Sequence, residues 1–121
     1  MDQEFSPRSV YTSIIDQLVK ESVLPADRLQ NGIYSKAPDH GKFNNFIATL
    51  NSEQRTLLAE MLNSEHIDAV HGVLATLTWW IVCHDVTWNY KGEEMPVDIS
   101  GMGLHGDYVG RLADWEWPEP D

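Results

Sequence analysis

The apolar stretch over residues 65–84 constrains the fold of this chain more than any other segment. Its apolar residues recur every three or four positions: Ile67, Val70, Val73, Leu74, Leu77, Trp80 and Ile81. This spacing places them on one face of an α-helix. The last turns, from Trp79 to Cys83, are apolar on nearly every side, and a helix of that kind is normally covered all round. The sequence therefore predicts that a helix over 65–84 forms the centre of the core.

Two shorter helices are predicted near the N-terminus. Ser6 and Pro7 are a typical helix start, because serine caps the first turn and proline already has the helical φ. An amphipathic pattern then continues over residues 7–22. Further on, Pro25 is expected to begin a short second helix and Gly32 to end it.

Two more helices are expected between these and the long stretch. Apolar residues over 43–50 recur at helical spacing, and Asp39 is a candidate cap for that helix. Asn51 and Gln54 match a capping box, in which the two side chains satisfy free backbone N–H groups reciprocally. The helix that starts there is expected to break at residues 63–64, where Asn and Ser would cap the helix that follows.

The pattern changes after Asp85. Apolar and polar residues alternate over 86–90, a Gly-containing turn follows, and residues 93–97 complete a predicted β-hairpin. A glycine-rich loop over 100–106 and a short helix over 107–114 are expected next. The Trp- and Pro-containing tail, residues 115–121, is predicted to fold back onto the body, because large aromatic rings are costly to leave in water.

Length and composition favour one globular domain over residues 1–121. The chain has 121 residues, of which 42% are hydrophobic and 22% charged, and both fractions are ordinary for a folded domain. The predicted fold is mainly α: a small orthogonal helical bundle of four to five helices, with a short β-hairpin and a Gly-rich loop near the C-terminus.

Charge is the most unusual property of the sequence. The formal net charge is −11, and residues 57–121 hold twelve acids against only two bases, Lys91 and Arg111. Direct binding to nucleic acid or to an anionic membrane needs lysine and arginine to neutralise phosphate, so neither is expected. The acidic half serves either solubility or the docking of a basic protein partner.

The expected compartment is the cytoplasm. The first residues lack the basic start and apolar stretch of a secretory signal, and no uninterrupted apolar run reaches the roughly 20 residues of a membrane helix. Cys83 is the single cysteine, so an intrachain disulfide is impossible. A lone cysteine in an apolar stretch is expected to be buried.

The glycines of residues 101–106 match G-x-G-x-x-G by letter. A dinucleotide site also needs a preceding buried strand, a complete βαβ unit and a later acid, and the fifteen residues after Gly106 leave no room for them. Asp107 would also place a carboxylate where the pyrophosphate belongs. We therefore interpret the motif as a tight turn that needs glycine's φ freedom, in which Asp107 is itself the anion held by backbone N–H groups.

Some histidines and acids have the residue types of metal ligands or catalytic groups. Asp68 and His71 lie three residues apart, so they can share one helix face, but a bundle metal site needs at least one further pair. Ser100, His105 and Asp107 contain the residue types of a hydrolytic triad, although closeness in sequence is no sign of the required geometry. No cofactor and no tightly bound metal are expected.

Two function hypotheses follow, and the oligomeric state stays open. The first is a non-enzymatic protein-binding, regulatory or immunity-type module that engages a basic partner. Its binding residues would be Glu93, Glu94, Trp115, Glu116, Trp117 and Glu119. The alternative is a metal-dependent or hydrolytic enzyme that uses His71 and Asp68 of the long helix with His105 and Asp107 of the Gly-rich loop. The segment over residues 95–118 is distinctive, but it resembles no family with a known activity.

Overall fold

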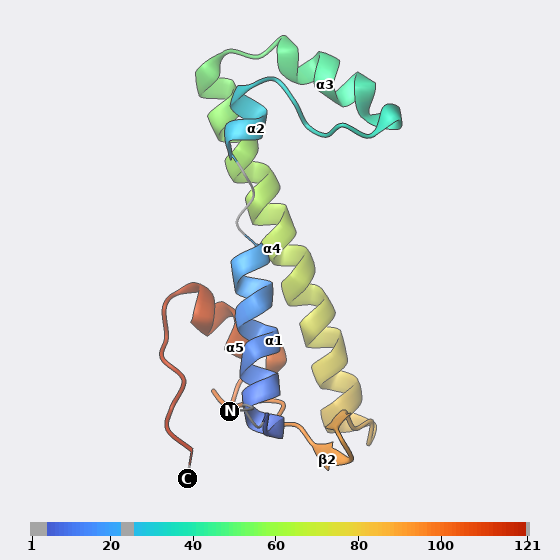
Figure 1. Ribbon diagram of the computed structural model, residues 1–121, viewed down its shortest axis with the longest axis vertical. Helices are drawn as coiled ribbons and strands as arrows, with labels where there is room; N and C mark the ends of the chain where they lie inside the picture. The colour runs from blue at the N-terminus through green and yellow to red at the C-terminus, as the bar shows by residue number, and fades with distance from the viewer. Residues whose placement is uncertain (1–4, 23–25, 121) are drawn as a thin grey trace. The chain divides into compact units, whose positions relative to one another are not determined.

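The computed structural model describes residues 5–22 and 26–120, and these form a mainly helical protein (Figure 1). Within the described residues the elements are α1 (Pro7–Glu21), α2 (Ala26–Gln30), the 3₁₀ helix η1 (Pro38–His40), α3 (Gly41–Ala48), α4 (Ser52–Cys83), β1 (Asn89–Tyr90), β2 (Glu93–Glu94) and α5 (Gly103–Leu112). The predicted fold class, mainly α with a hairpin near the C-terminus, is confirmed.

The chain divides into two compact units. The terminal unit comprises Met1–Glu21 and Asp68–Asp121, and the middle unit comprises Ser22–Ile67. That residues 1–121 form one domain stays a prediction.

Two predicted helix starts are confirmed in atomic detail. At α1, the backbone N–H of Ser9 donates to Ser6 Oγ at 3.0 Å, and the backbone N–H of Ser6 donates to Ser9 Oγ at 2.8 Å. At α4, the Gln54 backbone N–H donates to Asn51 Oδ1 at 2.8 Å, and the Asn51 backbone N–H donates to Gln54 Oε1 at 2.9 Å. Both are reciprocal caps that satisfy the free N–H groups of a first turn.

The predicted helix break at residues 63–64 is wrong, because α4 is continuous from Ser52 to Cys83. Asn and Ser each cost only a fraction of a kcal/mol in a helix interior. The strong helix formers on either side, which include Leu62 and Glu65, outweigh that cost.

The prediction that this helix is covered on all sides is also wrong. Leu74 is the one residue of α4 that is buried, whereas Trp80 is 46% exposed and Cys83 is exposed as well. The core of the terminal unit instead lies between α1 and α5, which pack side by side (Figure 1). Leu74 is the residue that α4 adds to this core.

The α1–α5 core is built from few large side chains. Tyr11 and Ile15 come from α1, Leu104 and Tyr108 come from α5, and all four are fully buried. Aromatic rings extend this core, because the Tyr11 ring meets Trp88 and Trp117 edge-on, with centroids 5.8 and 6.0 Å away.

Helix α5 begins at Gly103, four residues before the predicted start. The Leu104 backbone N–H donates to Thr78 Oγ1 of α4 at 3.0 Å, so the first turn of α5 is capped from another helix. Gly103 has φ +82°, and a Cβ there would lie 2.8 Å from the Thr78 methyl group. Because both the cap and the close approach come from tertiary contacts, local sequence placed the start too late.

The middle unit is organised by Arg55 near the start of α4. Its guanidinium donates to the backbone carbonyls of Gln30 at 2.7 Å and Ile47 at 3.2 Å, which joins the ends of α2 and α3 to α4. Asp39, the predicted cap of α3, makes no such cap: the cap position is His40, and no side chain caps it. The chain enters α3 through η1, so the cap position shifts by one residue.

The predicted hairpin is confirmed but is shorter than expected. Strands β1 and β2 pair antiparallel, with Asn89 opposite Glu94 and Tyr90 opposite Glu93. Lys91 and Gly92 both have positive φ, 49° and 82°, as a two-residue hairpin turn of matching twist requires.

By length and hydropathy alone, α4 is the one helix among the described residues that could cross a membrane. The apolar 18-residue window of α4 is 11% buried, so burial in a protein core does not account for its hydropathy. The expectation of no membrane contact stays a prediction.

The contrast between two leucines of α4 is testable. Leu74 is 5% exposed and Leu77 is 42% exposed. We expect Leu74→Ala to lower the free energy of unfolding by about 2–5 kcal/mol, because it leaves a cavity in the core. Leu77→Ala should cost less than half as much. Urea denaturation followed by circular dichroism measures both free energies of unfolding. Equal losses of stability would contradict the assignment of Leu74 to the buried side of α4 and Leu77 to the exposed side.

Candidate functional sites

Asp107 of α5 is a buried carboxylate with three hydrogen-bond donors. It is fully buried. Its Oδ1 accepts from the Ser100 backbone N–H at 2.8 Å, and its Oδ2 accepts from the Ile99 backbone N–H at 3.0 Å and from the Tyr11 hydroxyl. Asp107 is therefore an anion held by backbone N–H groups, as interpreted, but these groups belong to Ile99 and Ser100 and not to the glycines of residues 101–106.

Tyr11 completes this arrangement from α1. The pKa of its phenol is raised well above the usual value, first because burial disfavours the phenolate. The hydrogen bond to Asp107 and the negative charges of Asp107 and Asp98 raise it further. The hydroxyl therefore stays protonated and acts as a fixed donor, which suits a structural anchor.

The glycines of the G-x-G-x-x-G match serve close packing. Gly101 and Gly103 have φ +85° and +82°, and Gly103 and Gly106 lie within α5. A Cβ at Gly106 would come within 2.3 Å of Met102 Cβ. The motif is thus a tight turn into a helix, as predicted, and the backbone N–H groups that hold Asp107 precede its glycines.

The residues of the enzymatic hypothesis are only partly brought together. The His71 and His105 rings lie 5.1 Å apart and meet edge-on, whereas Asp107 bonds to α1 and Asp68 is exposed. Ser100 Oγ accepts from the Met102 backbone N–H at 3.2 Å. Within the described residues, no three His, Cys, Asp or Glu side chains are grouped so that they could hold a metal.

The two histidines line a surface hollow of about 480 Å³. Ser100, Val109 and Trp115 contribute to the same wall. The Nδ1 atom of His105 is buried and has no hydrogen-bond partner among the described residues. This nitrogen lies on the side of Gly103, 3.1 Å from where a Cβ would be at that position.

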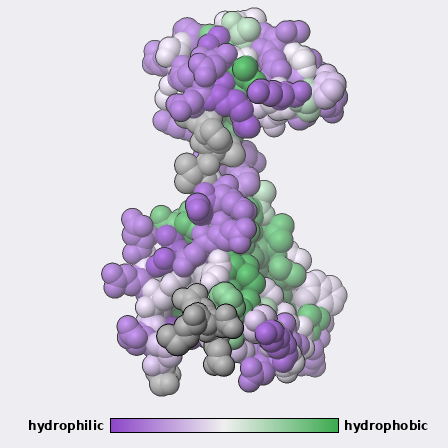
Figure 2. Space-filling view, viewed as in Figure 1, coloured by the Kyte–Doolittle hydropathy of each residue, from purple (hydrophilic) through white to green (hydrophobic). Residues whose placement is uncertain are grey.

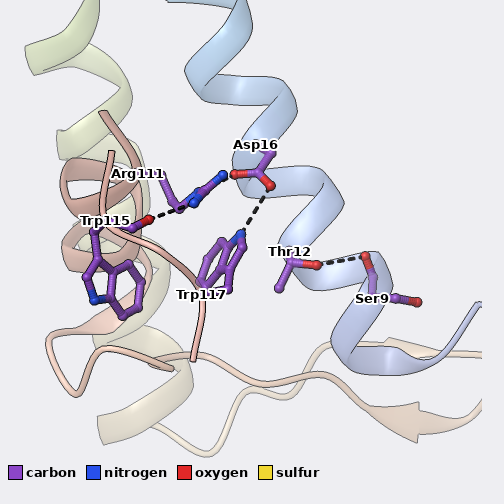
Figure 3. Close-up of polar contacts among 6 residues, drawn as sticks. All are labelled: Ser9, Thr12, Asp16, Arg111, Trp115 and Trp117. Carbon is purple, nitrogen blue, oxygen red and sulfur yellow. Dashed lines mark hydrogen bonds and ion pairs between the residues drawn. The ribbon is translucent and has the colours of Figure 1, made fainter. Parts of the chain in front are cut away.

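The C-terminal tail folds back onto α1, as predicted (Figure 3). Asp16 accepts from Arg111 Nε at 2.6 Å and from Trp117 Nε1 at 3.1 Å. Arg111 also donates to the Trp115 carbonyl at 2.6 Å, and its guanidinium lies 5.4 Å from the centre of the Trp117 ring. One ion pair between α1 and α5 thus holds both tryptophans of the tail.

The six predicted binding residues fall into two groups. Four are exposed carboxylates: Glu93 and Glu94 on β2, and Glu116 and Glu119 in the tail. Trp115 and Trp117 are half-buried, and the centroids of their rings lie 5.3 Å apart. Their role in binding a partner stays a prediction.

An exposed apolar surface runs along α4 that the sequence did not predict. We call it the α4 face: the exposed side of α4 from Ala69 to Cys83, together with His84, which follows directly. Its large residues include Val73, Leu77 and Trp80, which are 61%, 42% and 46% exposed. Figure 2 shows hydrophobic surface gathered along this part of the terminal unit. No residue from 69 to 84 is an Asp, Glu, Lys or Arg.

Aromatic rings gather at the C-terminal end of the α4 face. The Trp79 and Trp80 rings lie 5.0 Å apart, and the His84 ring lies 4.2 and 4.8 Å from them. Trp79 is 50% exposed. The signal for it in the sequence is the absence of Asp, Glu, Lys and Arg over sixteen residues of an acidic chain.

Comparison with known proteins identifies a family but no activity. A model described as "Family of unknown function (DUF6547)" matches residues 4–119, nearly the whole chain. No curated protein matches the sequence. No solved structure matches it either.

Removing one carboxylate oxygen at Asp107 tests the anchor. In Asp107→Asn an NH₂ group must face a backbone N–H or the Tyr11 hydroxyl, so we expect the free energy of unfolding to fall by at least about 1–3 kcal/mol. The matched control is Asp98→Asn, at an exposed position nearby, where the change should stay within about 0.5 kcal/mol. Similar losses in both variants, measured by urea denaturation, would argue against the anchor.

The raised pKa of Tyr11 predicts a loss of stability at high pH. Below about pH 10 the phenol is protonated in both the folded and unfolded chain. Above it the unfolded chain releases this proton first, so the folded state is disfavoured as pH rises. We expect Tyr11→Phe to be less stable than the wild type at neutral pH, but to lose less stability between about pH 9 and pH 11. If the wild type and Tyr11→Phe lose the same stability over this pH range, the raised pKa of Tyr11 would be contradicted.

Proposed function

We propose that this chain, which belongs to the DUF6547 family, is a non-enzymatic protein-binding module that engages a basic partner through the α4 face. The observation that carries the proposal is the exposure of large apolar side chains along α4, with Val73 61% exposed and Trp80 46% exposed. Exposed apolar patches on soluble proteins commonly mark interaction sites. The proposal keeps the cytoplasmic location that the sequence indicates.

The aromatic cluster on this face suits a binding hot spot. Tryptophan is enriched among the residues that carry most of the energy of protein interfaces, and Trp79 and Trp80 are both about half exposed. In this proposal they supply the desolvated contact, whereas Trp115 and Trp117 hold the acidic tail against α1.

Charge supports a basic partner. Of the two bases in residues 57–121, Arg111 is already paired with Asp16. No ion pair among the described residues involves the exposed carboxylates of β2 and the tail, which are Glu93, Glu94, Glu116 and Glu119. A negative surface of this kind speeds encounter with a positively charged protein. In this proposal the acids therefore set the association rate and the α4 face sets the dissociation rate.

The state of Asp107 favours binding over catalysis. Both of its oxygens accept hydrogen bonds, one of them from Tyr11 of α1. Asp107 does not line the hollow that His71 and His105 share. The alternative of a metal-dependent or hydrolytic enzyme is left with His71 and His105 in their hollow. Zinc titration of the wild type and of His105→Ala tests that alternative directly.

The binding proposal is tested first by affinity capture from the native host, followed by mass spectrometry. We expect the wild type to retain a basic protein that Leu77→Asp fails to retain, because a carboxylate in the middle of the α4 face would be desolvated without a counter-charge. Leu57→Asp is the matched control, since Leu57 is an exposed leucine of the same helix in the middle unit. It should retain the partner, and circular dichroism should show that both variants stay folded.

The kinetics of the captured pair then separate charge from contact. Charge reversal in Glu116→Lys/Glu119→Lys should lower the association rate more than it raises the dissociation rate, and salt above about 0.15 M should act in the same direction. Leu77→Asp should mainly raise the dissociation rate. If Leu77→Asp and Leu57→Asp both retain the partner, the α4 face is not its binding site.

A further inference from the structure

We infer that the partner segment seated on the α4 face is an apolar α-helix with lysine or arginine at both of its ends. The inference rests on the proposed function and adds the chemistry of the partner. It follows from three features of the terminal unit: the uncharged face, the acids beyond its two ends, and the lack of backbone hydrogen-bonding groups along a helix side.

Acids stand at both ends of the α4 face. Asp68 precedes it and Asp85 follows it, and both side chains are exposed. Asp85, two residues after the last residue of α4, has φ +57°. The free carbonyls of the last helical turn add partial negative charge at this end. Between the two acids there is no charged residue. A complementary segment is therefore uncharged in its middle and positive at both ends.

The length of the α4 face and its lack of free backbone groups both favour a helical partner segment. Residues 69–84 span about 24 Å along the helix axis, which a partner helix of about 16 residues matches. An extended segment would have to bury its own N–H and C=O groups against α4, whose backbone groups are used within the helix. A helix satisfies its own backbone, and the small exposed residues Gly72 and Thr76 let it approach closely.

A second copy of this chain fits the face poorly. In an antiparallel pair Asp68 of one copy would lie near Asp85 of the other, and in a parallel pair each acid would lie near its own counterpart. Either arrangement places like charges together in a molecule whose net charge is already −11. An anionic bilayer meets the same objection, because the face offers no lysine or arginine.

The test uses three synthetic helical peptides that share one Leu/Ala core of about 12 residues and differ only in two Lys, two Gln or two Glu at each end. Isothermal titration calorimetry with the full chain should rank the affinities as Lys, then Gln, then Glu. We expect at least about a tenfold difference between the first and the last. The double variant Asp68→Lys/Asp85→Lys should reverse this order.

A matched charge change elsewhere on α4 separates local from overall electrostatics. Glu53→Lys/Glu60→Lys alters the net charge equally at exposed positions of the middle unit, and it should leave the order of the peptides unchanged. Leu77→Asp should weaken all three peptides at least about tenfold. If Glu53→Lys/Glu60→Lys reverses the order as well, the peptides sense only total charge and the inference fails.

The remaining outcomes also decide between occupants. Equal binding of the three peptides, or binding of none while Leu77→Asp still loses the native partner, would overturn the helix with basic ends but leave the proposed function standing. A dimer of the wild type that Leu77→Asp abolishes in sedimentation equilibrium would assign the face to a second copy. Sedimentation of the wild type, but not of Leu77→Asp, with phosphatidylcholine vesicles would assign it to a lipid surface.

Discussion

The carboxylate of Asp107 is the contact on which the rest of the terminal unit depends. It ties α5 to α1 through the Tyr11 hydroxyl, and it ties both helices to the segment after the hairpin through the N–H groups of Ile99 and Ser100. A buried charge with no partner would be very costly, but one with three donors holds its neighbours in a single arrangement.

A second polar contact, near the surface, also joins α1 to the C-terminal part of the chain. Asp16 lies on α1 five residues after Tyr11, and it joins Arg111 and Trp117 (Figure 3). The pair is partly exposed, so its ionic component contributes little by itself. Its effect is to hold the Trp117 ring near Tyr11, where the two rings lie 6.0 Å apart. The acidic tail is thereby attached to the same helix pair that Asp107 joins.

The sequence predicted the features that depend on neighbouring residues, but it did not predict those that depend on contacts between distant parts of the chain. The caps at Ser6 and Asn51 and the turn at Lys91–Gly92 depend on residues within three positions of each other, and each is confirmed. The start of α5 depends on Thr78, which lies 26 residues away, and it was placed too late. Among the site residues, the role of Asp107 was foreseen because it follows the glycines directly. The meeting of His71 with His105 had no local signal.

The exposed α4 face follows from how the core is built. Because α1 and α5 pack against each other around Asp107, α4 contributes one buried residue, Leu74, and its other side has no covering element in the described part of the terminal unit. Periodicity reports that a helix side is apolar, but it does not report what covers that side. A high net charge opposes association between copies of a chain, even where one surface carries no charge. The acids of the C-terminal half all lie outside residues 69–84, and the apolar side of α4 carries no Asp or Glu of its own.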